Sequence, residues 1–390
     1  MARRDIRQAW IQDRFVKIFG IEAFFPESTP LWIECGYKYT DLDYVSKRSK
    51  SAATFRWQWV KAAKKREAEA VEAEKKGHLK TAHDEYHRAA LYYGRAQWSI
   101  FEDNDEKAEL HGNLVRCFDK MMKYNDYPME KVEIPFGNRT IPGILHLPLN
   151  GDRSPCVIFI VGRDMMKEEY PNPNNNIFLR RGMAVLSIDG PGYGESNIRK
   201  FKLTLDNFEK VGKACVDYLE TRKEIDSSKI GACGVSFGSY LAPRVASYDH
   251  RLKSVAVAMG SYYARDRTTE SAAPIFLSNI AYMTGVADEE EVTKLAGKMS
   301  LEGLEDKIQC GMLLIQGQFD ELCPEKYAHQ LFDRAVNAKP RRLEIYENQF
   351  HPLGGVIVQV FDKLADWTRD RFDGKEEPDD AVKVFVKESG

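Results

Sequence analysis

A serine between two glycines is the first feature of this sequence that could carry out chemistry. Gly234-Val-Ser236-Phe-Gly238 has the spacing G-x-S-x-G, with an apolar run at residues 229–233 before it and a helical pattern after it. A sharp turn from a strand into a helix needs small residues two positions either side of the serine, because only then does its Oγ project above the sheet. An ordinary Gly-Ser turn is the alternative, and residues elsewhere in the chain must decide between the two.

An acid and a base follow the serine in the chain order that this motif requires. Asp320 comes just after one apolar run, and His351 comes just after the next. Functional sites of open α/β sheets form at the carboxyl ends of the strands, which is where all three residues are expected. We therefore predict Ser236 as the nucleophile, His351 as its base and Asp320 as the acid that orients the histidine. Glu321 is the rival acid by adjacency, and Asp320 is preferred because it comes first after the strand.

Acyl transfer also needs hydrogen-bond donors for the negatively charged oxygen of the intermediate. One donor is expected to be the backbone N–H of Phe237, the residue after the nucleophile. We predict the backbone N–H of Arg163, in the loop after the third strand, as the second donor. Val161-Gly162 stands where a His-Gly pair is usual, so the identity of the second donor stays open.

A glycine-rich segment, Asp189-Gly-Pro-Gly-Tyr-Gly-Glu-Ser196, superficially resembles a phosphate-binding loop. It lacks the lysine and the immediate helix start of a P-loop, and its glycines do not have the spacing GxGxxG. We interpret it as a structural turn after the fourth strand.

No metal site or organic cofactor is predicted. His83 and His87 have the i, i+4 spacing of a metal-binding pair, but an HExxH pattern and an evident third ligand are both lacking. We interpret them, together with His78, as partly exposed surface residues. The seven cysteines are scattered, without a CxxC pair, and we expect buried reduced thiols.

The order of apolar runs and amphipathic stretches from residue 128 onward predicts a doubly wound, mostly parallel sheet over residues 128–373. A β-hairpin comes first, at residues 131–136 and 140–147. The further strands are expected at residues 156–161, 184–188, 229–233, 254–258, 312–315 and 342–346. The helices are expected at residues 174–181, 205–223, 237–247, 325–336 and 355–372. Residues 261–307 interrupt this rhythm, and we expect a helical insertion, or lid, after the sixth strand.

The first third of the chain, residues 1–127, is predicted to be a helical domain. Residues 53–122 contain no proline, and residues 57–76 and 79–101 are expected to form an antiparallel hairpin broken at Gly77. At the other end, residues 374–390 are polar and acidic, and we expect a loosely held tail.

Composition narrows the range of partners. The 390 residues are 43% hydrophobic and 30% charged, with a formal net charge of −2. This balance gives no electrostatic reason to expect nucleic acid or an acidic membrane as partner. No apolar stretch approaches the roughly 20 residues that span a bilayer, and the charged N-terminus lacks the apolar core of a signal peptide. We expect a cytoplasmic protein that binds a small-molecule substrate.

The motifs together resemble the α/β-hydrolase superfamily. They are the Asp189–Ser196 segment, Gly234-x-Ser236-x-Gly238, Gly317-x-x-Asp320 and His351. Gly162-Arg-Asp-Met-Met-Lys-Glu-Glu169 is similar to the Gly-Gly-x-(Asp/Glu)-Ser-x-Lys-Glu-Glu segment of one group within it. That group contains 2,6-dihydroxypseudooxynicotine hydrolase, fungal polyketide-shortening hydrolases and the fermentation-respiration switch esterases. Val161 and Met165 depart from its pattern, where glycine and serine are expected.

The resemblance implies further properties. The helical domain of that group packs on the hydrolase domain and helps to enclose the active site, and several members cleave a carbon–carbon bond next to a ketone. Such chemistry calls for an additional acid, for which Asp266 and Glu270 in the insertion are the candidates. A homodimer is also implied by resemblance.

The hypothesis is a serine hydrolase acting on a small aromatic or polyketide-like carbonyl compound, by C–C bond hydrolysis. A carboxylesterase with the same three residues is the alternative within enzymes. A ligand receptor with a vestigial triad, and a protein-docking role of the helical hairpin, are the alternatives from other classes.

Overall fold

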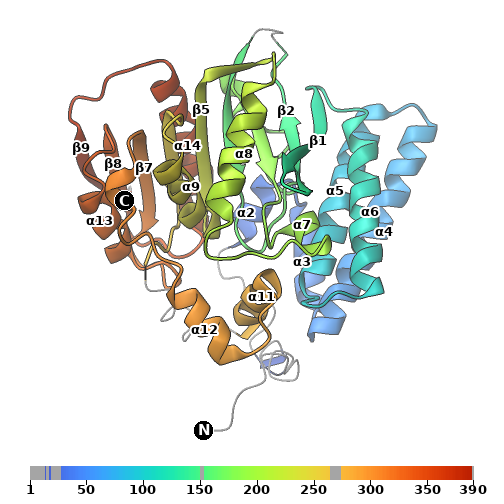
Figure 1. Cartoon of the computed structure of the whole chain (residues 1–390). Coiled ribbons are helices and arrows are strands. Elements are labelled where there is room, and N and C mark those ends of the chain that lie inside the picture. Colours follow the sequence, from blue (N-terminus) through green and yellow to red (C-terminus); the bar gives the residue numbers. More distant parts are fainter. Residues whose placement is uncertain (1–13, 15–16, 19–27, 150–152, 264–273, 389–390) are drawn as a thin grey trace.

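The computed structural model describes residues 14, 17–18, 28–149, 153–263 and 274–388. A twisted nine-stranded sheet forms the middle of the molecule, a group of long helices stands beside it, and two short helices lie beyond one end of the strands (Figure 1). In this part of the chain no helix is long and apolar enough to cross a membrane.

The sheet has the order β1-β2-β4-β3-β5-β6-β7-β8-β9. The first two strands pair antiparallel with each other, β2 pairs antiparallel with β4, and all later neighbours are parallel. The strands are β1 Met129–Phe136, β2 Arg139–His146, β3 Ser154–Ile160, β4 Ala184–Ile188, β5 Ile225–Val235, β6 Ser254–Ala258, β7 Gly311–Gly317, β8 Arg341–Tyr346 and β9 Ala381–Val386. The prediction of a doubly wound, mostly parallel sheet is confirmed.

The central strands form where the sequence is continuously apolar. Every residue of β3, β4, β6 and β7 is buried, as expected of parallel strands covered on both faces. The predicted bounds of β4 and β6 match the structure, and those of the other central strands differ by a few residues at their ends.

Helices connect the strands: η2 Leu179–Arg181, α7 Gly194–Ile198, α8 Phe208–Glu220, α9 Phe237–Tyr248, α13 Glu325–Arg334, η4 Gly354–Val356 and α14 Ile357–Phe372. The helix expected at residues 174–181 is wrong, because only the short 3₁₀ turn η2 forms there. Two asparagine side chains explain this. Asn172 Oδ1 accepts from the N–H of Asn174 at 3.0 Å, and Asn176 Oδ1 accepts from the N–H of Phe178 at 3.1 Å. These bonds satisfy the backbone in turns and compete with a helix.

The C-terminal segment is a strand rather than a loose tail. β9 pairs in parallel with β8 from Arg341↔Ala381 to Tyr346↔Val386. Its residues alternate between exposed and half-buried, because the strand lies at the edge of the sheet. Alternation in a polar, acidic setting is a weak signal, and the expectation of a loosely held tail was wrong.

The helical domain contains α2 Ser28–Glu34, α3 Tyr39–Arg48, α4 Ala52–Lys75, α5 Leu79–Trp98 and α6 Asp105–Met122. The predicted hairpin is present as α4 and α5, and Gly77 between them has a φ of +74°. Ser51 caps α4 and Asn104 caps α6. Aromatic rings fill the interior of this domain, for example Trp59 and Tyr92 with ring centroids 5.1 Å apart. The short helix α2 packs against α14, so the helical domain contacts the sheet domain there.

The insertion after β6 contains α11 Pro274–Thr284, α12 Glu289–Gly297 and η3 Glu305–Lys307. Leu277, Ile280, Ala281 and Val292 form a small apolar cluster of their own. Tyr282 connects the insertion to the helical domain, because its hydroxyl donates to Asp103 at 2.7 Å. Asp266 and Glu270, the predicted additional acids, lie outside the described residues.

Candidate active site

The predicted nucleophile lies on a strained turn between β5 and α9. Ser236 has φ 52° and ψ −114°, a conformation that costs a non-glycine residue on the order of 1–3 kcal/mol. Its N–H donates to the carbonyl of Ala258 in β6 at 2.9 Å, which holds the turn against the sheet. The strand therefore ends abruptly, and the serine side chain stands at the carboxyl edge.

The two glycines of the motif are required by close backbone contacts. A Cβ at Gly234 would lie 2.3 Å from the carbonyl oxygen of Gly238. A Cβ at Gly238 would lie 2.0 Å from the carbonyl oxygen of Ile160, at the end of β3. Both distances are far below van der Waals contact, so any side chain would force the turn open. The alternative of an ordinary Gly-Ser turn does not require this packing.

The structure brings the predicted base and acid to this serine. Ser236 Oγ and His351 Nε2 are 3.1 Å apart, and His351 Nδ1 lies 2.9 Å from Asp320 Oδ2. Asp320 follows β7 and His351 follows β8, so all three residues lie just past strand ends. The rival acid contacts only the backbone, because Glu321 Oε2 accepts from the N–H of His351 at 3.4 Å and does not reach the ring.

Four donors fix the carboxylate of Asp320. Oδ1 accepts from the N–H groups of Leu322 and Cys323 at 3.0 and 2.7 Å. Oδ2 accepts from Gln316 Nε2 at 2.9 Å, in addition to its bond with the histidine. Gln316 is the penultimate residue of β7 and accepts from the N–H of Gly260 at 3.1 Å, so its amide orientation is also fixed. Sequence reasoning missed Gln316, because nothing local distinguishes a glutamine at a strand end.

Charge from Asp320 governs the titration of His351. Burial lowers the pKa of the imidazole, but the Asp320 carboxylate, with help from the Cys323 thiol, outweighs this and raises it well above the usual 6.5. Asp320, Cys323 and His351 also have the spacing of a metal-binding group. The oxygens of Asp320 already accept four hydrogen bonds and Nδ1 of His351 faces one of them, so this donor set fits hydrogen bonding better than a cation.

The loop after β3 lies against the nucleophile. A Cβ at Gly162 would lie 3.5 Å from Cβ of Ser236. The hydroxyl of Tyr193 donates to the carbonyl of Val161 at 3.2 Å and holds the start of this loop. Arg163 follows directly, and Phe237 begins α9 on the other side of Ser236. The backbone of both predicted donors is thus adjacent to the serine.

The glycine-rich segment is a structural turn, as predicted. Asp189 is buried, and its carboxylate accepts from the N–H of Lys167 and the N–H of Glu195, both at 2.9 Å. A Cβ at Gly194 would lie 2.2 Å from Asp189 Oδ2, so glycine is needed there. Lys167 Nζ also pairs with the carboxylates of Glu168, Asp189 and Glu195. These three acids surround the lysine where a phosphate-binding loop would need room for a phosphate.

A crevice beside Arg163 opens between the helical domain, the glycine-rich turn and α11. Trp98, Phe101, Lys107, Met165, Met166 and Tyr282 are among its lining residues. Trp98 and Phe101 pack edge to face with centroids 5.8 Å apart. Burial lowers the pKa of Lys107 to about 7, and its Nζ lies 4.7 Å from the centroid of the Tyr282 ring. The crevice therefore combines aromatic and thioether surface with polar groups, among them Arg163 and Asp164, while the Lys107 amine donates to the carbonyls of Gln97 and Ile100.

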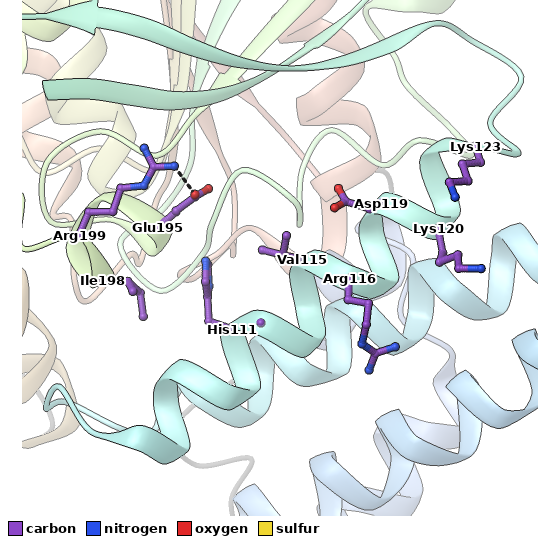
Figure 2. A pocket seen from close by; sticks show the side chains of 10 residues that line it. His111, Val115, Arg116, Asp119, Lys120, Lys123, Glu195, Ile198 and Arg199 are labelled. Carbon is purple, nitrogen blue, oxygen red and sulfur yellow. Dashed lines mark hydrogen bonds and ion pairs between the residues drawn. The ribbon is translucent and has the colours of Figure 1, made fainter.

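A second cavity of about 560 Å³ lies between α6 and α7 (Figure 2). None of the three predicted catalytic residues lines it. Three of its cations are paired with carboxylates: Arg116 with Glu67, Lys120 with Glu74, and Arg199 with Glu195. Its charge is thus largely neutralised. Ser236, Asp320 and His351 do not line the crevice beside Arg163 either, but that crevice includes the predicted oxyanion donor and is therefore the better candidate for substrate binding.

The prediction for two histidines of the helical domain is wrong. His83 and His87 are each only 1% exposed rather than lying on the surface. His83 has both ring nitrogens engaged, with Asp84 and Asn125. Burial lowers the pKa of His87 to about 3. The tyrosines of α5 are buried as well, so these histidines lie within the interior of the helical domain. All seven cysteines lie in the described part of the chain, and they are buried and form no disulfide, as predicted.

Comparison with known proteins identifies the family. The model of a family described as Esterase FrsA-like matches residues 42–317, more than half of the chain. The chain belongs to this family. Its fold and its membership make it a hydrolase, and the resemblance drawn from its motifs is confirmed.

Curated relatives extend over most of the chain. It is 26% identical to 2,6-dihydropseudooxynicotine hydrolase of Paenarthrobacter nicotinovorans over 337 residues, 86% of this chain and 89% of the relative. It is 30% identical to Hydrolase LUC6 of Fusarium sp over 349 residues, 77% of this chain and 82% of the relative. Esterase FrsA of Escherichia coli O157:H7 is 24% identical over 301 residues, 73% of this chain and 69% of the relative.

Solved structures show the same fold. The crystal structure of the 2,6-dihydroxy-pseudo-oxynicotine hydrolase superposes with a TM-score of 0.80 at 24% identity, covering 91% of this chain and 98% of the other. AbyA5 gives a TM-score of 0.69 at 18% identity, covering 94% and 98%. The likeness includes the helical domain, because it extends over nearly the whole of each chain.

Proposed function

We propose that this hydrolase is a serine enzyme that acts on a small aromatic or polyketide-like carbonyl compound. The observation that carries the proposal is the hydrogen-bonded series from Ser236 through His351 to Asp320, on a strained turn at the carboxyl edge of the sheet. A nucleophile, a base and an orienting acid in this geometry are the constellation of acyl transfer.

The reaction follows from these positions. Ser236 Oγ attacks the substrate carbonyl while His351 Nε2 takes the hydroxyl proton, and the carbonyl electron pair moves to its oxygen. The backbone N–H groups of Phe237 and Arg163 are the proposed donors to that oxygen. When the intermediate collapses, the bond to the leaving group breaks and His351 returns the proton to it. Water then attacks the acyl-enzyme with the same base, releasing an acid and restoring the serine.

The crevice supports the proposed substrate class. Trp98, Phe101, Met165 and Met166 line it next to Arg163, and such side chains suit a flat apolar ring or a short conjugated chain. The crevice has a volume of about 40 Å³ in this structure, so its wall would have to move apart to admit such a substrate. The relatives support a small-molecule substrate, because one of them is named as the hydrolase of a pseudooxynicotine compound. Ester and C–C hydrolysis use the same three residues, so the bond cleaved is set by the leaving group.

The test is a product analysis over two matched panels. Aryl esters of short acids form the first, and aryl 1,3-diketones and acyl phenols form the second. Products are quantified by liquid chromatography for wild type and Ser236→Ala. Turnover of either panel by wild type and not by Ser236→Ala supports the proposal, and the panel that is consumed identifies the bond. Binding of these compounds by a folded wild type without any turnover would favour a ligand receptor instead.

A further inference from the structure

One buried arginine of the helical domain reaches the loop that follows β3. Arg95 lies on α5, and its side chain is 1% exposed. Nη2 donates to Glu169 Oε1 at 3.0 Å, and Nη1 donates to Asp164 Oδ2 at 3.5 Å. Tyr37, also from the helical domain, donates its hydroxyl to the same Glu169 oxygen at 2.7 Å. Two carboxylates of one hydrolase-domain loop are thus held from the other domain.

That loop is part of the proposed catalytic machinery. It runs from Gly162, which packs against Ser236, through the proposed donor Arg163 to Asp164. The second oxygen of Glu169 accepts from the N–H of Met166 at 3.1 Å, and the N–H of Glu169 donates to the carbonyl of Met166 at 2.9 Å. Glu169 therefore closes the turn at the end of the loop with one oxygen and binds the helical domain with the other.

The surroundings fix the plane of the guanidinium. Its Cζ lies 5.1 Å from the ring centroid of Trp32 and 5.9 Å from those of Tyr37 and Trp98. Burial raises the pKa of Glu169, and the charge of Arg95 and the Tyr37 hydroxyl oppose this. Within the described part of the chain, Nε of Arg95 has no hydrogen-bond partner. A buried ion pair rarely stabilises a fold more than apolar residues would, so stability alone is a poor reason for this charge.

We propose that Arg95 is a positioning residue for hydrolysis, which acts through Glu169 and Asp164 to set the backbone of the loop that carries the second oxyanion donor. The inference rests on the proposed serine mechanism. It gives the helical domain a part in transition-state stabilisation beyond covering the crevice. Displacing a donor by about 1 Å weakens its bond to a developing oxyanion while leaving the bond to the ground-state carbonyl almost unchanged.

The test compares three full-length variants. Arg95→Met keeps a long buried side chain and removes both donors. Tyr37→Phe removes one hydroxyl bond to Glu169. Arg88→Met is the matched control, because Arg88 lies on the same helix and pairs only with Asp84 and Glu85 of that helix. For each variant, kcat and KM are measured on an aryl ester that wild type hydrolyses. The inhibition constant of a trifluoromethyl ketone is measured too, since its serine adduct carries the oxyanion.

For Arg95→Met, we expect kcat to fall about 10²-fold at nearly unchanged KM, with the trifluoromethyl ketone losing affinity by the same factor. Tyr37→Phe should show a smaller fall in kcat and in affinity for the trifluoromethyl ketone, and Arg88→Met should match wild type in both quantities. Unchanged kcat and inhibitor affinity in folded Arg95→Met would overturn the role of Arg95 while leaving the serine mechanism intact. If Arg95→Met does not fold, unchanged values in Tyr37→Phe overturn it. A wild type that is inert toward both panels, of esters and of ketones, and toward fluorophosphonate would instead refute the proposed function.

Discussion

Replacing the acid with its isosteric amide, Asp320→Asn, tests how the structure controls the histidine tautomer. Oδ1 of Asp320 accepts from two backbone N–H groups, of Leu322 and Cys323. We expect an asparagine to keep its oxygen there, because an NH₂ group would face two backbone donors. At the position of Oδ2 it faces one fixed donor, Gln316 Nε2, and His351, which can change its tautomer. Its NH₂ group then takes the position of Oδ2, opposite His351 Nδ1.

The tautomer that results cannot act as a base. Nδ1 of His351 must accept from the new NH₂ group, so the proton moves to Nε2, the atom that faces Ser236 Oγ. Nε2–H cannot take the serine proton. Loss of the correct tautomer in a serine–histidine pair costs about 10⁴-fold in kcat, or about 5 kcal/mol of activation free energy. The residual rate should also persist to lower pH, since the charge that raises the pKa of His351 is gone while burial, which lowers it, remains.

Steady-state hydrolysis of an aryl ester measures both effects. Glu321→Gln is the matched control, because Glu321 contacts only the backbone N–H of His351 and its loss should change kcat less than tenfold. Urea unfolding confirms that both variants are folded. The reasoning is refuted if Asp320→Asn keeps more than a tenth of the wild-type kcat, or if Glu321→Gln loses as much as Asp320→Asn.

Three further outcomes follow from the structure. Gly238→Ala should abolish turnover, because the new Cβ would collide with the carbonyl of Ile160. Urea titration should show a free energy of unfolding lower by about 1–3 kcal/mol or more, and wild-type stability would contradict this. In wild type, kcat/KM should fall as the pH is lowered, with an apparent pKa above 6.5, because His351 must be neutral to act and its pKa is raised. An apparent pKa below 6 for this decline would contradict the role of His351 as the base. Burial lowers the pKa of His146 to about 3, so the unfolded chain binds a proton that the folded chain does not, and stability is lost as pH falls below about 6.5. His146→Leu should make that decline shallower by about 1.4 kcal/mol per pH unit between pH 6 and 4, and an unchanged slope would show that the imidazole titrates normally.

Ser236, Asp320 and His351, which the structure brings together, could be picked out because each one is marked by its local sequence. Gly234 and Gly238 predict the turn. Asp320 and His351 each follow a short apolar run that indicates a buried strand. Parallel strands then carry their ends to one edge without any knowledge of side-chain contacts. The order of the three residues along the chain, serine, then acid, then histidine, indicated the role of each.

What sequence reasoning missed depends on distant contacts. Gln316 matters only because β6 and the Asp320 loop approach it, and Arg95 only because α5 packs beside the loop after β3. The burial of His83 likewise results from the packing of α5 against its neighbours. The edge strand β9 has a polar, alternating sequence whose pairing is visible only beside β8.

The central claim is that Ser236 is an activated nucleophile, and covalent labelling tests it most directly. Wild type and Ser236→Ala are exposed to a fluorophosphonate and measured by intact-protein mass spectrometry, followed by peptide mapping. The account predicts one adduct on wild type, located on Ser236, and none on Ser236→Ala at the same concentration and time. An adduct on another residue, equal labelling of Ser236→Ala, or a catalytically active wild type that stays unlabelled at saturating probe would contradict it.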